Sequence, residues 1–98
     1  MSTATLNAPG VITVSFADSV IMQLDDITKN LDANQTGSFK HDELYGRVMD
    51  IGDFTADVLV ICLDTIDSIF AKGNPKRRVS SYTLNTQLKK KLAELRSE

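Results

Sequence analysis

Two stretches of this 98-residue chain repeat one pattern of apolar and acidic residues. ADSVIMQLDDITKNL, residues 17–31, aligns with ADVLVICLDTIDSIF, residues 56–70, and both contain Ala-Asp, then Leu-Asp, then an isoleucine two places later. In the first copy the apolar residues recur at helical spacing, which predicts an amphipathic helix. The run VLVICL in the second copy could by itself be a buried strand, but its alignment with the first copy favours a helix there too.

The repeat extends past these two segments, because three apolar positions of the first half recur in the second half. They are Phe39, Leu44 and Val48 in the first half and Val79, Leu84 and Leu88 in the second. The repeated unit is therefore a helix, a loop and a second helix, with a period of about 39 residues. A unit of this kind needs a neighbour to bury its apolar face.

These patterns predict an all-α fold of four helices, arranged as two antiparallel helix-loop-helix hairpins around one core. The first helix is expected to have its N-cap at Ser15 or Asp18, and the second helix is expected to end at Gly52. The third helix is expected to run from Asp53 or Thr55 to about Ala71, and the fourth to begin at Ser80 or Ser81. The side chains expected in the core are Leu24, Ile27, Leu63, Ile66, Phe70, Leu84 and Leu88.

The chain is expected to form a single domain with an N-terminal arm. Residues 1–15 suit a flexible or extended arm, in which VITVSF alternates well enough for a short strand. Residues 16–98 would then form one helical domain, with the first unit at about 16–52 and the second at about 53–97.

Polar residues gather in the connection of the first unit, DANQTGSFKHDE, residues 32–43. Oxygen-bearing side chains occupy its first, third and fifth positions, a glycine occupies the sixth, and a glutamate closes it. Calcium is a hard cation that takes six to eight oxygen ligands, and a twelve-residue loop between two helices can surround it. Over residues 16–97 the chain resembles the EF-hand family, with one near-complete calcium loop.

The resemblance implies a role for each position of this loop. Gly37 would take the positive φ that the sharp bend requires, and Phe39 would pair its backbone with the equivalent residue of the other loop. Ser38 would offer its backbone carbonyl, Glu43 both carboxylate oxygens, and Lys40 occupies a position that usually works through a water. The implied metal-site positions are Asp32, Asn34, Thr36, Ser38, Lys40 and Glu43.

Both loops depart from the family pattern. Thr36 stands where Asp or Asn is usual. Only two of the ligand positions, Asp32 and Glu43, carry a carboxylate, which predicts a weak calcium affinity on the order of 10⁻⁵ to 10⁻³ M. The second connection, AKGNPKRRVSSYT, has no acidic residue and would be a degenerate hand that supports the first. The alternative for residues 32–43 is an ordinary helix connection, since Asp, Asn, Thr and Gly are also turn residues.

The leading hypothesis is a small non-enzymatic regulatory protein that binds calcium weakly and contacts a partner protein. In the family, movement of the closing glutamate toward the ion exposes apolar residues between the two hands. The candidate partner-binding residues are Met22, Phe39, Val48, Met49 and Phe70.

Two alternative functions share the same predicted core. VITVSFADSVIMQL resembles the strand-then-helix opening of ribbon-helix-helix repressors, which would make the chain a nucleic-acid-binding homodimer, although the strand lacks basic residues that read bases. The candidate phosphate contacts in that case are Lys76, Arg77, Arg78, Lys89, Lys90 and Lys91. The other alternative is an ion-free helical adaptor or inhibitor protein.

Composition and motifs argue against several other classes. The net charge of −2 creates no strong field for nucleic acid or membrane, although eight of the eleven basic residues lie from Lys72 onward. The longest apolar run is too short to span a bilayer, and the first ten residues lack the pattern of a secretory signal, so a cytoplasmic location is expected.

The sequence shows no nucleophile–base pair and no glycine-rich phosphate loop, which argues against an enzyme. His41 has no companions for a zinc site, and Cys62 is expected to be a buried hydrophobe.

Overall fold

The computed structural model describes residues 15–35, 37–71, 73 and 77–97, and within these ranges the chain is mostly helical. The elements there are, in order, α1 Phe16–Ala33, β1 Ser38–Phe39, α2 His41–Met49, α3 Ala56–Phe70, β2 Val79–Ser80 and α4 Ser81–Arg96. The predicted all-α fold of four helices in two helix-loop-helix units is confirmed. Most of the predicted N-terminal arm, including the first four residues of VITVSF, lies outside the described residues. Within the same ranges, none of the helices combines the length and the apolarity that a bilayer crossing requires.

N-cap residues in an extended conformation precede three of the helices. Ser15 Oγ accepts a hydrogen bond from the backbone N–H three residues later, at 3.1 Å, and Ser80 Oγ accepts the equivalent bond at 3.3 Å. Each serine thereby satisfies one of the N–H groups that a helix start leaves free. Thr55 precedes α3 in an extended conformation, and its N–H donates to Gln23 Oε1 on α1 at 2.9 Å. The N-caps are therefore Ser15, Thr55 and Ser80.

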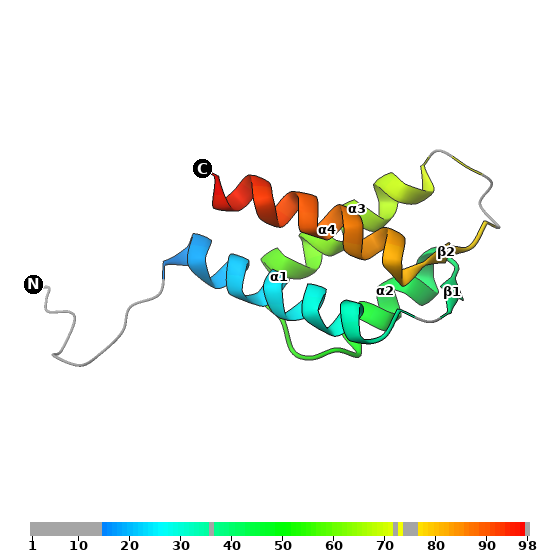
Figure 1. The fold of residues 1–98 in the computed structure, drawn as a ribbon, viewed down its shortest axis with the longest axis horizontal. Coiled ribbons are helices and arrows are strands. Elements are labelled where there is room, and N and C mark those ends of the chain that lie inside the picture. The colour runs from blue at the N-terminus through cyan, green and yellow to red at the C-terminus, as the bar shows by residue number, and fades with distance from the viewer. Residues whose placement is uncertain (1–14, 36, 72, 74–76, 98) are drawn as a thin grey trace, which may run out of the picture.

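Each helix finds its main partner in the other unit. α1 packs most extensively against α4, and α2 against α3, while α3 makes smaller contacts with α4 and α1. In Figure 1, α1 and α4 run antiparallel, side by side, along the length of the molecule. The two units therefore bury their apolar faces against each other, as expected for a repeat of this length.

One apolar core lies between the four helices. Five of the predicted core side chains are fully buried: Leu24, Ile27, Ile66, Leu84 and Leu88. The prediction was wrong for Leu63 and Phe70, which are only half-buried. On α3 the buried residues are Val58, Cys62 and Ile66, at four-residue steps. Leu63 lies one position beyond this stripe, so its side chain points partly away from the core.

Cys62 confirms its prediction as a buried hydrophobe. Its side chain is fully buried in the middle of α3. Burial raises the pKa of its thiol to about 12, because the thiolate would lose its hydration among apolar neighbours. The thiol is therefore held protonated at neutral pH.

The connections of the two units meet at one end of the molecule (Figure 1). β1 and β2 pair antiparallel, with Phe39 opposite Val79, so the predicted backbone pairing of these two residues is confirmed. Gly37 has φ 97°, in the left-handed region, and a Cβ there would lie 3.1 Å from the Phe39 ring. A glycine is needed at this bend for both reasons. The bend brings the polar loop of the first unit against the second unit.

Candidate functional site

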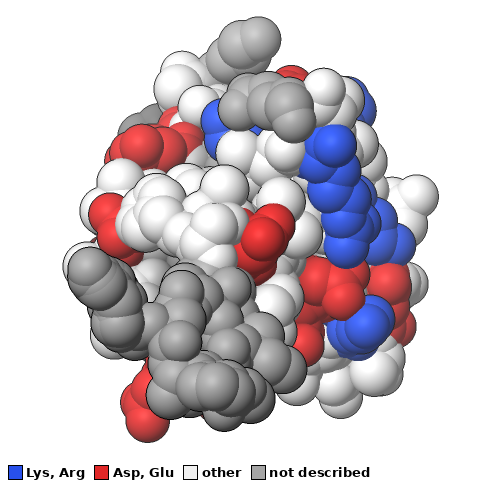
Figure 2. Space-filling view, turned by 90° about the vertical axis from the view of Figure 1, so that its left-hand side faces the viewer, with Lys and Arg blue, Asp and Glu red and all other residues white. Residues whose placement is uncertain are grey.

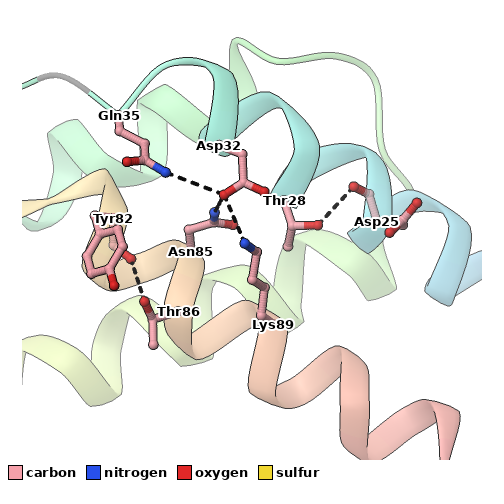
Figure 3. A network of polar contacts seen from close by, with 8 residues as sticks. All are labelled: Asp25, Thr28, Asp32, Gln35, Tyr82, Asn85, Thr86 and Lys89. Atoms are coloured by element: carbon pink, nitrogen blue, oxygen red, sulfur yellow. Dashed lines mark hydrogen bonds and ion pairs between the residues drawn. The ribbon is translucent and has the colours of Figure 1, made fainter.

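Asp32, the first predicted calcium ligand, lies in the last turn of α1 and faces α4. Its Oδ1 accepts hydrogen bonds from Asn85 Nδ2 at 2.6 Å and from Lys89 Nζ at 2.9 Å, with a longer one from Gln35 Nε2 at 3.4 Å (Figure 3). Asn85 and Lys89 are four residues apart and therefore share one face of α4. The hydrogen bond from Lys89 is the main cause that lowers the pKa of the Asp32 carboxyl. The chain's own donors thus hold this carboxylate in its charged form.

Asn85 is the buried member of this network and was missed in the sequence. Its side chain is 2% exposed, and its Oδ1 has no hydrogen-bond partner among the described residues. A buried amide oxygen without a partner costs free energy. The hydrogen bond from Nδ2 to Asp32 is therefore the polar contact that favours burial of this side chain. The available signal was its position beside Leu84 and Leu88, where a polar residue interrupts an otherwise apolar stripe.

Glu43, the predicted closing ligand, also meets a cation of the second unit. Its Oε1 accepts the backbone N–H of Lys40 at 2.8 Å, which caps the start of α2, and lies 3.4 Å from Arg78 Nη1. The same Arg78 nitrogen donates to the backbone carbonyl of Ser38 at 3.1 Å. One arginine therefore contacts two of the oxygens that the resemblance assigns to calcium.

The other predicted positions contribute no converging oxygen that the structure describes. The Asn34 side-chain amide donates to the backbone carbonyl of Asn30 at 3.0 Å and so closes the end of α1. Thr36 lies outside the described residues. The Lys40 side chain is exposed.

The arrangement does not fit a calcium ion as it stands. Calcium needs six or more oxygens that converge on one point. In the described part of the chain, no group of three or more Asp, Glu, His or Cys side chains is placed to hold a metal ion. The carboxylates of Asp32 and Glu43 are instead each in contact with a positively charged side chain of the second unit.

The predicted partner-binding residues differ in their exposure to solvent. Met22 is 59% exposed and Met49 50% exposed. Phe39 and Phe70 are half-buried against the core. Val48 is fully buried, because it lies on the face of α2 that packs into the core, and it is therefore unavailable to a partner in this conformation.

The six candidate phosphate contacts are also divided among different environments. Arg78 and Lys89 are in the ion pairs described above, and Lys76 lies outside the described residues. The remaining three line a groove between α3 and α4: Arg77, Lys90 and Lys91. These positions therefore do not form one free basic surface in the part of the chain that is described.

His41, which has no zinc partners in the sequence, joins α2 to α3. Its Nε2 contacts the carboxylate of Asp67, its Nδ1 lies 2.8 Å from the carboxylate of Asp42, and its ring packs edge-on against Phe70 with centroids 5.6 Å apart. The hydrogen bond to Asp67, followed by that to Asp42, raises the pKa of His41 above its ordinary value.

We expect the stabilising contribution of His41 to fade as the pH rises. Because its folded-state pKa lies above the ordinary 6.5, the contribution is complete below about pH 6.5 and is lost as the pH passes through the raised value. Thermal melts should therefore show a larger difference in Tm between wild type and His41→Gln at about pH 5.5 than at about pH 9. The effect should be small, since the side chain is 35% exposed. An equal difference at both pH values would contradict the contact with Asp67.

Comparisons of the chain with protein-family models, with curated proteins and with solved structures give no match.

Proposed function

We propose that this protein is a non-enzymatic, ion-independent interaction module built from two helix-loop-helix units. In place of calcium, positively charged side chains of the same chain contact the carboxylates of its first loop. The observation that carries the proposal is the pair of contacts from the second unit, Lys89 Nζ to Asp32 Oδ1 at 2.9 Å and Arg78 Nη1 to Glu43 Oε1 at 3.4 Å.

These two cations occupy the places where an ion would act. A calcium ion on Asp32 would have to displace Lys89, and the displaced ammonium group would remain close enough to repel it. Asp32 is also oriented by the buried amide of Asn85, so turning the carboxylate toward an ion would break that hydrogen bond. Arg78 likewise covers the Ser38 carbonyl.

The contacts also supply the cross-linking that a metal ion would otherwise provide. The Asp32 network joins α1 to α4, and Arg78 joins the first loop to the start of β2. Exposed ion pairs alone contribute little to stability, but here they accompany a buried amide hydrogen bond and a backbone pairing. A fold held in this way presents the same surface whatever the metal concentration, which suits a constitutive scaffold or adaptor.

Weak calcium binding is the second candidate, and three observations favour it. Gly37 has the positive φ of a sharp loop bend, Phe39 pairs with Val79, and Glu43 lies in the first turn of α2. In this case calcium would compete directly with Lys89 and Arg78 for the two carboxylates.

Thermal melts in millimolar calcium and in chelator separate the two candidates. An ion-independent module should melt at the same temperature in both, whereas calcium that binds the folded state must raise Tm with its concentration. Lys89→Gln should increase any calcium response, because it removes the competing charge. Lys29→Gln is the matched control, since Lys29 also pairs with an aspartate, Asp25, at 2.8 Å. A rise in the wild-type Tm with calcium would overturn the proposal.

A further inference from the structure

A groove of about 680 Å³ runs between α3 and α4, away from the polar loop. Its basic side chains are Arg77, at one end, and Lys90 and Lys91 on α4, and Glu94 is the one carboxylate among its lining residues. Ile69 gives the groove an apolar wall, and the remaining lining is mostly hydroxyl and amide side chains. The groove therefore combines positive charge, hydrogen-bonding groups and an apolar surface.

The cations of α4 divide between two sides of the helix. On the side of α1, Lys89 pairs with Asp32 at 2.9 Å and Arg96 with Asp25 at 3.3 Å, so the positive charge there is compensated. On the groove side, Lys90 forms no ion pair with any described carboxylate. Its neighbour Lys91 approaches Glu94 only at 4.0 Å, at the limit of an ion pair.

Arg77 adds a further uncompensated charge to the groove. Its guanidinium lies 5.8 Å from the centre of the Phe70 ring, a cation–π arrangement that holds the side chain while leaving its charge free. It forms no ion pair within the described ranges either. The groove thus contains positive charge that the described fold does not neutralise.

We infer that the groove between α3 and α4 binds an acidic peptide segment of a partner protein. The inference rests on the proposed function as an interaction module, and it names the surface and the partner chemistry. Carboxylates of the peptide would pair with Arg77 and Lys90, and its apolar side chains would contact Ile69. Complementary charge of this kind chiefly sets specificity and the rate of association.

The surface favours a peptide over a nucleic acid. A nucleic-acid backbone needs a continuous run of free cations, whereas Arg78, Lys89 and Arg96 are paired with carboxylates. The face shown in Figure 2 likewise carries a run of basic side chains that borders acidic ones.

The test adds three probes in turn to the ¹⁵N-labelled full chain and measures the shifts of its backbone amides by NMR. The first probe is a peptide with glutamate and leucine at helical spacing, the second is the same peptide with glutamine for glutamate, and the third is single-stranded oligothymidine. The groove variant is Arg77→Gln with Lys90→Gln. The matched control is Lys29→Gln with Lys40→Gln, which removes the same charge from exposed positions outside the groove.

We expect the acidic peptide to shift the amides of residues 65–71 and 83–94. Its affinity should fall about tenfold or more in the groove variant, less than about twofold in the control, and steadily with added salt. Absence of shifts with the acidic peptide, equal losses in both variants, or tighter binding of the oligonucleotide would each overturn the inference. None of these outcomes alters the calcium melts, so failure here is distinguishable from failure of the ion-independent module.

Discussion

Replacing Leu88 with alanine is expected to lower the free energy of unfolding by about 3 to 5 kcal/mol. Leu88 is fully buried in the core on α4, the helix that forms the most extensive pair in the molecule with α1. Truncation removes apolar contacts and leaves a cavity, because the packed helices can collapse only partly around the missing atoms. Urea unfolding followed by circular dichroism measures the loss.

Leu63→Ala is the matched control for this substitution. It deletes the same atoms from a leucine that is only half-buried on α3, so the expected loss is about 1 kcal/mol or less. Equal losses for the two variants would contradict the orientation of α3, in which Cys62 faces the core and Leu63 lies beside it.

Asn85→Asp is expected to destabilise the protein by about 3 kcal/mol near neutral pH, although it changes almost no volume. The side chain is 2% exposed, and its Nδ2 donates to Asp32 Oδ1 at 2.6 Å. The substitution replaces that donor with a second carboxylate oxygen, which is buried and repelled by the first. Among the described residues, Lys89 is the one cation bound to Asp32, and it cannot neutralise both groups.

The loss should depend on pH. Burial and repulsion raise the pKa of the introduced carboxyl in the folded state, so the destabilisation is absent below about pH 4 and grows as the pH rises through the raised value. Asn85→Leu removes the unpartnered oxygen together with the donor, and should change stability by less than about 1 kcal/mol. A variant with aspartate that is as stable as wild type at neutral pH would show that Asn85 does not contact Asp32.

The duplicated apolar pattern was enough to predict the four helices. Periodicity alone could not distinguish strand from helix in residues 58–63, but the aligned first copy did so, because a repeated unit keeps its secondary structure. The same alignment made Val79 the equivalent of Phe39, and the two residues pair in the structure. Local caps and apolar spacing agree with the fold at each of these points.

The roles of the polar residues could not be predicted in the same way. A carboxylate at the start of a loop has the same sequence signature whether it faces an ion or a lysine, and the lysine that Asp32 meets is 57 residues away. That contact depends on how α4 is rotated against α1. The rotation of α3 against its neighbours likewise explains why Leu63 was wrongly predicted to lie in the core. A segment that is apolar on all sides does not show which side its neighbours will cover.

The pairing of each helix with a partner in the other unit also affects how the chain can fold while it is being synthesised. α1 emerges from the ribosome first, but its buried stripe packs most extensively against α4, the last of the four helices to be made. Until then its apolar residues lack their main native partner and have only the smaller contact with α3. Contacts between distant segments form slowly, because a long loop must close first. The nascent chain is therefore expected to complete its core in one late step and to depend on ribosome-associated chaperones before that step.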